Sequence, residues 1–161
     1  QIQKHKETVQ RIAEEGHALA LHGVSHNKQQ FYASQYSVIN EMTITQHTVK
    51  EITGVETVLI RTPFGSSPHM TPLYKEAVKT AGFILWDWNV DSRDWQFKGP
   101  EYIVHTLLQV EEVVKRGEEP VILLHDLVST VEHLTVLLDE LNDMGFVFKA
   151  IEEGMEPIEL K

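Results

Sequence analysis

Short apolar runs alternate with amphipathic segments along the whole chain, and this alternation restricts the possible folds. The runs that predict β-strands cover residues 17–22, 57–61, 83–90, 121–124 and 146–151. The segments that predict helices cover residues 1–15, 34–53, 71–81, 100–116 and 129–144. Regular alternation of strand and helix predicts parallel strands covered by helices, as an open sheet or as a barrel. In both architectures, ligands bind at the carboxyl ends of the strands.

Three helix ends carry clear sequence signals. Thr71-Pro72 predicts a helix start, with Thr71 as the N-cap and proline at the first helical position. Ser129 and Glu132 predict a capping box at the start of the last helix. Gly54 predicts the end of the second helix.

Composition bounds the size and the class of the protein. A chain of 161 residues, 42% of them apolar, is long enough for a single α/β domain over residues 1–161 with a real core. Its net charge of −10, spread along the predicted helices, argues against nucleic acid or an anionic membrane as a partner. The sequence has no apolar stretch long enough for a membrane span, and no cysteine for disulfide bonds or thiolate ligands. It leaves the oligomeric state open.

Polar side chains stand where four of the predicted strands end. They are, in chain order, His22, Arg61, Asp94 and His125. His26 lies four residues after His22, and two imidazoles at this spacing can reach one divalent metal ion. Because the carboxyl ends of parallel strands share one rim, we expect these groups to converge on a single cavity.

Each of these residues also has a purely structural interpretation. His22 and His26 are alternatively surface histidines, and Arg61 is alternatively one half of a surface salt bridge. Asp94 is alternatively a helix or turn cap, and His125 a hydrogen-bonded core histidine. Taken one at a time, the residues leave both interpretations open.

The polar residues belong to four short motifs that occur in a fixed order. The motifs are His22-x-x-x-His26, Arg61-Thr-Pro-Phe-Gly65, Asp91-Ser-Arg-Asp94-Trp95 and Leu123-Leu-His125. This ordered set resembles four of the five motifs of the polysaccharide deacetylases of the NodB-homology group, carbohydrate esterase family 4. The resemblance covers the chain from His22 to His125.

The resemblance implies a distorted (β/α) barrel and metal-dependent removal of acetyl groups from a polysaccharide. It implies that His22 and His26 bind a divalent metal ion, most often zinc. Arg61 would orient the catalytic base, and Asp94 would pair with His125, the general acid. The substrate-binding residues would be Trp95, Leu123, Thr62 and Pro63. Of these, Trp95 and Leu123 would line the pocket for the acetyl group, and the backbone N–H of Thr62 would help to hold the oxyanion.

These roles agree with what amide hydrolysis requires. The reaction needs an activated water, donors for the negative charge on the carbonyl oxygen, and a proton for the departing amine. A metal held by neutral imidazoles lowers the pKa of its bound water, and a histidine facing a carboxylate can donate the proton.

Two departures from the family pattern affect this prediction. The family's first motif, a Thr-Phe-Asp-Asp-Gly-like run that supplies the base and the third metal ligand, does not occur in the sequence. That motif would lie upstream on the first strand, and the chain starts at Gln1, so we expect an N-terminally truncated domain with low or no activity as given. Gly23 stands where the family usually has Ser or Thr, and this removes a hydroxyl that could hold the loop.

The leading interpretation is a hydrolase that removes N-acetyl or O-acetyl groups from a polysaccharide. We expect the substrate to be a bacterial cell-wall amino-sugar glycan, peptidoglycan, and the location to be extracytoplasmic, secreted or bound to the cell envelope. The first alternative is a catalytically inactive glycan-binding domain of the same fold. A second alternative is another metallohydrolase on a (β/α) barrel, in which Asp126 or His69 would approach His22 and His26.

Overall fold

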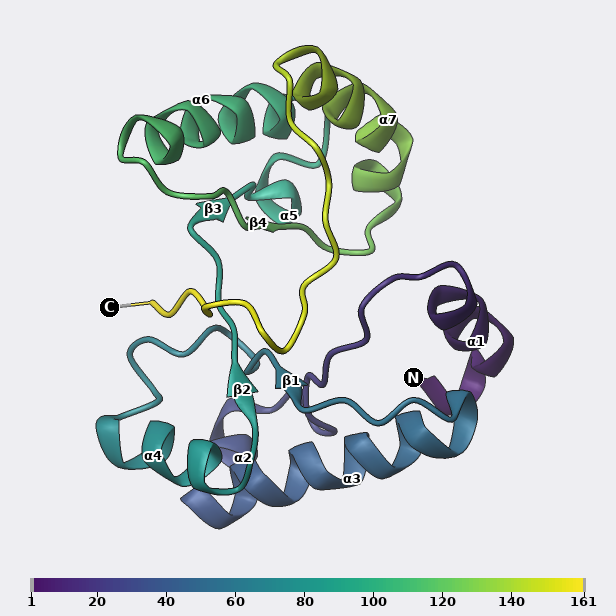
Figure 1. The fold of residues 1–161 in the computed structure, drawn as a ribbon, viewed down its shortest axis with the longest axis vertical. Coiled ribbons are helices and arrows are strands. Elements are labelled where there is room, and N and C mark those ends of the chain that lie inside the picture. The colour runs from purple at the N-terminus through teal and green to yellow at the C-terminus, as the bar shows by residue number, and fades with distance from the viewer. Residues whose placement is uncertain (1, 161) are drawn as a thin grey trace. The chain divides into compact units, whose positions relative to one another are not determined.

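The computed structural model describes residues 2–160, which divide into two compact units (Figure 1). Unit 1 comprises the chain up to Asp87 together with the chain from Ala150 onward, and unit 2 comprises Trp88–Lys149. Each unit has its own pair of parallel strands and its own apolar cluster, so each is described by itself. The single domain over residues 1–161 stays a prediction.

Unit 1 combines five helices with three extended segments. Its helices are η1 (Ile2–Lys4), α1 (Lys6–Glu14), α2 (Lys28–Phe31), α3 (Gln35–Thr53) and α4 (Pro72–Thr80). Strand β1 (Leu59–Ile60) pairs in parallel with β2 (Ile84–Leu85), with Leu59 opposite Ile84 and Ile60 opposite Leu85. Leu21 forms a parallel bridge with Ile60, so the segment that ends at His22 lies along the other edge of β1.

The core of unit 1 forms where α3 packs near the strands. Val38, Met42 and Val49 lie on one face of α3 and are buried. They join the same apolar cluster as Leu21 and Ile60. Because each fully buried aliphatic side chain contributes roughly 1.5–3 kcal/mol, this cluster fixes the strand ends that carry His22 and Arg61.

Several predicted helix ends in unit 1 are confirmed. Ser34 caps α3 in a capping box with Ser37, and Gly54 ends the helix in the left-handed conformation at φ +76°. Thr71 occupies the N-cap of α4 and Pro72 its first position, although the Thr71 side chain makes no capping hydrogen bond.

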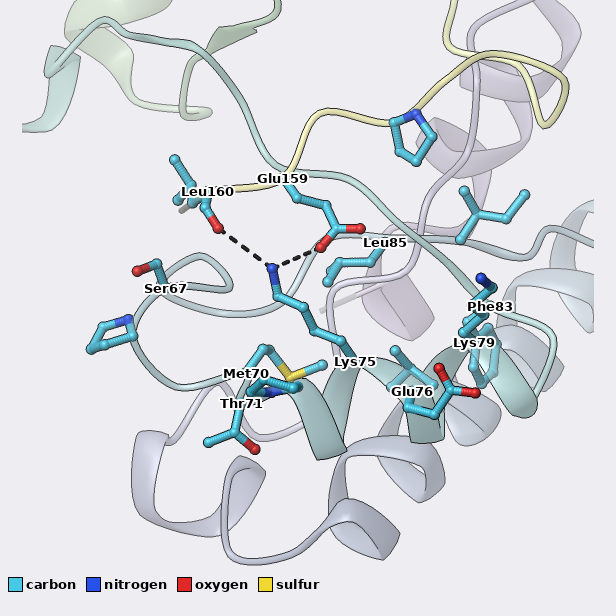
Figure 2. A pocket seen from close by; sticks show the side chains of 15 residues that line it. Ser67, Met70, Thr71, Lys75, Glu76, Lys79, Phe83, Leu85, Glu159 and Leu160 are labelled. Carbon is cyan, nitrogen blue, oxygen red and sulfur yellow. Dashed lines mark hydrogen bonds and ion pairs between the residues drawn. The ribbon is translucent and has the colours of Figure 1, made fainter.

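The C-terminal segment of the chain returns to unit 1 and runs beside the end of β2. The backbone N–H of Asp87 donates to the carbonyl oxygen of Ile158 at 2.7 Å. The N–H of Leu160 donates to Asp87 Oδ2 at 2.9 Å. Figure 2 shows Lys75 of α4 reaching across a pocket of about 860 Å³ to Glu159, at 2.7 Å, and to the Leu160 carbonyl oxygen, at 3.4 Å.

Unit 2 also joins two parallel strands through helices. Its elements are β3 (Val90–Asp91), α5 (Asp94–Phe97), α6 (Glu101–Lys115), β4 (Ile122–Leu123) and α7 (Val128–Asp143). β3 and β4 pair in parallel, with Val90 opposite Ile122 and Asp91 opposite Leu123. The parallel pairing in both units confirms the predicted α/β class.

The predicted fifth strand over residues 146–151 is wrong. None of these described residues belongs to a strand or to a β-bridge. The N–H of Phe146 donates to the carbonyl oxygen of Leu141 and so serves to end α7. Val147 is 80% exposed and Phe148 53% exposed, because no neighbouring strand pairs with this segment or covers its side chains.

The predicted capping box at Ser129 and Glu132 is also wrong. α7 begins at Val128, and its N-cap, Leu127, makes no side-chain capping hydrogen bond. The carbonyl oxygen of Leu127 accepts the N–H groups of both Thr130 and Val131, so the first turn closes before the predicted cap.

Residues 28–31, which lie outside the predicted helices and strands, form the short helix α2. Asn27 is its N-cap, and the Asn27 side chain accepts the N–H groups of Gln29 and Gln30. Among the described residues, no helix combines the length and the apolar character needed to cross a membrane.

Candidate active site

His22 and His26 lie next to each other in unit 1. His22 Nδ1 lies 2.6 Å from the carbonyl oxygen of Arg61. Because a carbonyl oxygen only accepts, this bond assigns the proton of the neutral His22 ring to Nδ1 and its lone pair to Nε2. The centroids of the two imidazole rings are 5.2 Å apart. His26 adopts φ +46°, and its ring lies 4.8 Å from that of Phe64.

The carboxylate of Glu41, on α3, holds the loop between the two histidines. Glu41 Oε2 accepts the N–H groups of Val24 at 2.8 Å and Ser25 at 2.9 Å, and Oε1 accepts the Ser25 hydroxyl at 2.7 Å. Burial acts to raise the pKa of Glu41, but the hydrogen bonds from Ser25 and Val24 outweigh it and lower that pKa. The loop is therefore anchored to α3 through an ionised carboxylate.

The loop after Arg61 is held by the hydroxyl group of Tyr32. Thr62 and Pro63 are buried, and the Tyr32 hydroxyl lies 2.7 Å from the carbonyl oxygen of Pro63 and 2.9 Å from that of Gly65. A phenol has one proton, so the two carbonyl groups share a single donor. This contact fixes the turn that presents the backbone of Thr62.

Asp87 is a buried carboxylate near Arg61 that the sequence analysis did not identify. Asp87 is 2% exposed, and its Oδ1 accepts the N–H of Ser66 at 2.9 Å. Burial lowers the pKa of the Arg61 guanidinium, and the nearby Asp87 charge acts in the opposite direction. A charged residue inside the apolar run over residues 83–90 is the signal that could have indicated it.

Asp94 and His125 form a hydrogen-bonded pair in unit 2. His125 Nδ1 lies 2.7 Å from Asp94 Oδ1, and the His125 backbone N–H donates to Asp94 Oδ2 at 2.7 Å. The Asp94 side chain is fully buried, whereas 36% of the His125 side chain is exposed. His125 is therefore not a core histidine: it shows one edge of its ring to solvent and binds the carboxylate with the other.

The Asp94 carboxylate accepts two further hydrogen bonds. The N–H of Trp95 donates to Oδ1 at 3.0 Å, and the hydroxyl of Thr130 donates to Oδ2 at 2.7 Å. Burial acts to raise the pKa of Asp94, but the hydrogen bonds from His125 and Thr130 outweigh it and lower that pKa. The Asp94 carboxylate is thus held in its ionised form.

Trp95 and Leu123 differ in exposure. Trp95, the second residue of α5, is 53% exposed, and Leu123, in β4, is 8% exposed. Their roles in binding an acetyl group stay predictions. The convergence of the groups of unit 1 and unit 2 on one cavity also stays a prediction.

Comparison with known proteins identifies the family. The family described as Polysaccharide deacetylase matches residues 1–86, which is more than half of the chain. The chain belongs to the polysaccharide deacetylase family. Two of the four sequence motifs, those around His22 and Arg61, lie inside the matched part.

Similar polysaccharide deacetylases occur in bacilli. The chain is 41% identical over 155 residues to "Putative polysaccharide deacetylase YheN" of Bacillus subtilis, a match that covers 95% of this chain and 55% of that protein. It is 29% identical over 155 residues to a peptidoglycan-N-acetylglucosamine deacetylase of Bacillus cereus, covering 94% of this chain and 56% of that protein. The chain therefore spans about half the length of these curated relatives.

A solved structure confirms the predicted fold type. The crystal structure of the polysaccharide deacetylase Bc1974 from Bacillus cereus superimposes with a TM-score of 0.81 at 29% sequence identity. The superposition covers 98% of this chain and 78% of that one. The fold is thus that of the polysaccharide deacetylases, as the four motifs imply.

The two histidines fit a metal ion as a pair of ligands of this deacetylase fold. The centroids of the two rings lie 5.2 Å apart, so both imidazoles would be near enough to bind one ion. The bond from His22 Nδ1 to a carbonyl oxygen is the kind of outer contact that orients metal-binding histidines.

The structure adds no third protein ligand to this pair. Within residues 2–160, no group of three or more His, Cys, Asp and Glu side chains is arranged to hold a metal ion. Within unit 1, His69 therefore does not join His22 and His26 as a metal-binding group, and the alternative with Asp126, a residue of unit 2, stays a prediction. The His69 ring lies instead 5.0 Å from that of Tyr32.

Gly23 is required by the local structure of the histidine loop. It adopts φ +79°, and a Cβ atom built on it would lie 2.9 Å from the Phe31 ring. The loop is anchored at Ser25, whose hydroxyl donates to Glu41 Oε1 at 2.7 Å.

Proposed function

We propose that this chain carries most of the catalytic residues of a metal-dependent hydrolase that removes acetyl groups from a polysaccharide. The observation that carries the proposal is the pair formed by Asp94 and His125. A fully buried carboxylate fixes the ring of a partly exposed histidine, which is the arrangement of a proton donor held in one orientation.

The residues of unit 1 are proposed to bind the metal ion and to orient the reacting groups. His22 and His26 supply two imidazole ligands, and a bound divalent ion, zinc in our proposal, polarises the acetyl carbonyl and lowers the pKa of its bound water. Arg61 orients the catalytic base through its half-buried guanidinium. The turn at Thr62 and Pro63 presents a backbone N–H to the developing oxyanion.

The residues of unit 2 are proposed to deliver the proton and to bind the acetyl group. His125 donates from Nε2 to the departing amine, while its Nδ1–H stays bonded to Asp94 Oδ1. The Asp94 charge stabilises the doubly protonated ring before the transfer. Trp95 and Leu123 wall the pocket for the methyl group.

The proposed substrate is a bacterial cell-wall amino-sugar glycan. We propose that the protein acts on it outside the cytoplasm, either secreted or bound to the cell envelope. A relative at 29% identity is named a peptidoglycan-N-acetylglucosamine deacetylase, which supports an N-acetyl group on a glucosamine unit. The catalytic-base motif does not occur in the 161 residues, so we expect low activity from this chain alone.

The test measures acetate released from N-acetylglucosamine oligomers. We expect release by a protein extended upstream to include an Asp-Asp motif, and its loss on chelation and on His125→Ala. His47→Ala, which changes an exposed histidine on α3, serves as the matched control and keeps full activity. If the extended, zinc-loaded protein releases no acetate from peptidoglycan or from any acetylated glycan oligomer, the enzymatic proposal is wrong.

The second candidate is a glycan-binding domain without catalysis, and the absent base motif is the feature that favours it. In that case, the 161-residue chain binds N-acetylglucosamine oligomers with chelator present. The extended protein then binds them equally well and releases no acetate. Calorimetric titration of both proteins with the same oligomer separates the two functions.

A further inference from the structure

Thr130 lies outside the four sequence motifs, yet it donates a hydrogen bond to the Asp94 carboxylate. It lies in the first turn of α7 and is 2% exposed. Its hydroxyl donates to Asp94 Oδ2 at 2.7 Å, a short hydrogen bond of the kind made to charged acceptors. Since the carboxylate is buried, no water replaces this donor if it is removed.

Thr130 is itself held by the neighbouring helix. The hydroxyl of Tyr102, a residue of α6 that is 1% exposed, donates to the carbonyl oxygen of Thr130 at 3.0 Å. Tyr102, Thr130, Asp94 and His125 therefore form one continuous hydrogen-bonded series from α6 to the imidazole ring.

The four donors divide the two carboxylate oxygens between them. Oδ2 accepts from the Thr130 hydroxyl and the His125 backbone, and Oδ1 accepts from the His125 ring and the Trp95 backbone. The terminal torsion of an aspartate is broad, so its plane is set by its partners and not by a rotamer well. Without the Thr130 hydroxyl, Oδ2 keeps only the His125 backbone N–H as a donor, so the carboxylate plane is less firmly held against tilting away from the imidazole.

We propose that Thr130 is the positioning residue of the Asp94–His125 pair: its hydroxyl fixes the plane of the carboxylate and thereby the orientation of the imidazole. Its importance for turnover rests on the proposed function, but its effect on the pair does not. The titratable groups that face Asp94 are His125 and Tyr102. The pair can therefore be studied in the 161-residue chain without substrate or metal.

The experiment compares Thr130→Val with Thr130→Ser. Valine keeps the shape and removes the hydroxyl, and serine keeps the hydroxyl. Thr106→Val is the matched control, because Thr106 is equally buried and its hydroxyl donates to the carbonyl oxygen of Tyr102 within α6. The readouts are the carboxyl ¹³C titration of Asp94 and the NMR resonance of the His125 Nδ1 proton.

We expect Thr130→Val to raise the midpoint of the Asp94 titration and to broaden the Nδ1 proton resonance through faster exchange. Thr130→Ser and Thr106→Val leave both unchanged. If Thr130→Val does not fold, Tyr102→Phe decides, because it releases the Thr130 carbonyl and is expected to produce a smaller change of the same sign. The proposal is overturned if the Asp94 titration and the Nδ1 resonance are unchanged in folded Thr130→Val. If Thr130→Val does not fold, the same result in Tyr102→Phe overturns it.

The extended enzyme supplies an independent readout. There, Thr130→Val is expected to lower kcat by about tenfold with little change in KM, because the loss of one hydrogen bond to a charged group acts on proton transfer. If the NMR changes occur and no variant, including the unchanged protein, releases acetate, the proposed function fails while the positioning role stands.

Discussion

At Asp94, burial and hydrogen bonding act on the same carboxylate in opposite directions. The hydrogen bonds have the larger effect, so the pKa of Asp94 lies below its ordinary value and the group is ionised in the folded state. A carboxylate with a lowered pKa binds fewer protons in the folded state than in the unfolded state. Its contribution to stability is therefore present above the unfolded pKa and is lost as the pH falls.

We expect the free energy of unfolding to drop as the pH falls below about 4, the ordinary pKa of an aspartate. Asp94→Asn should be less stable at neutral pH and should lose part of this pH dependence. Urea unfolding between pH 3 and pH 7 measures both effects. Asp139→Asn, an exposed change on α7, is the control and should keep the slope of the unchanged protein.

Gly23 is a second residue whose identity follows from local geometry. We expect Gly23→Ala to destabilise the fold by about 2 kcal/mol, from the positive φ and from the contact with Phe31. Gly16→Ala is the control, because Gly16 has a similar φ of +82° but no atom within 4 Å of the added Cβ. Thermal unfolding should show the larger loss at Gly23. Equal losses would mean that the Phe31 contact contributes nothing.

Between elements, two carboxylates hold the loops that carry the candidate catalytic residues. Glu41 binds the loop between the histidines, and Asp87 binds the turn after Arg61. Both contacts join residues far apart in the sequence. The positions of the motif residues in the candidate site thus depend on carboxylates that lie outside the four sequence motifs.

Neutralising Glu41 should weaken metal binding without removing a ligand. We expect Glu41→Gln to lower the zinc affinity of the histidine pair by about tenfold, the size of effect usual for residues that orient metal ligands. Glu51→Gln, an exposed change on the same helix, is the control. Isothermal titration calorimetry with zinc measures the affinity of both variants. Equal affinities would show that Glu41 does not orient the histidine pair.

Some helices and strands could be predicted from the sequence alone, and others could not. Helix ends with glycine or proline signals, such as Gly54 and Pro72, are confirmed because a single residue determines the local backbone. The strand over residues 146–151 is wrong because pairing depends on a neighbour that no local pattern encodes. The hydrogen bonds of Thr130 and Asp87 could not be predicted for the same reason, because their partners lie tens of residues away in the sequence.

For the whole chain, the order of motifs was enough to predict the family, and the match over residues 1–86 confirms it. The two pairs His22–His26 and Asp94–His125 are each brought together as the motifs imply. The bonds that fix them could not be predicted, because a buried threonine or aspartate leaves no periodic trace in a sequence.

Removing residues 150–161 should destabilise unit 1 and spare unit 2. The change takes away the hydrogen bonds between Asp87 and the C-terminal segment and the ion pair of Lys75 with Glu159. Hydrogen exchange followed by mass spectrometry should show faster exchange around Ser66. Protection in α6 and α7 should stay unchanged. Glu153→Ala, an exposed change with the segment intact, is the control, and unaltered exchange at Ser66 after the deletion would contradict the expectation.

The return of the C-terminal segment to unit 1 has a consequence for biosynthesis. Asp87 leaves the ribosome long before Ile158 and Leu160 do. Its backbone N–H can bond to Ile158, and its carboxylate to Leu160, only after those residues have been synthesised. Unit 2 is continuous in sequence and is under no such delay. During translation, unit 1 can therefore complete these two contacts only after unit 2 has been synthesised.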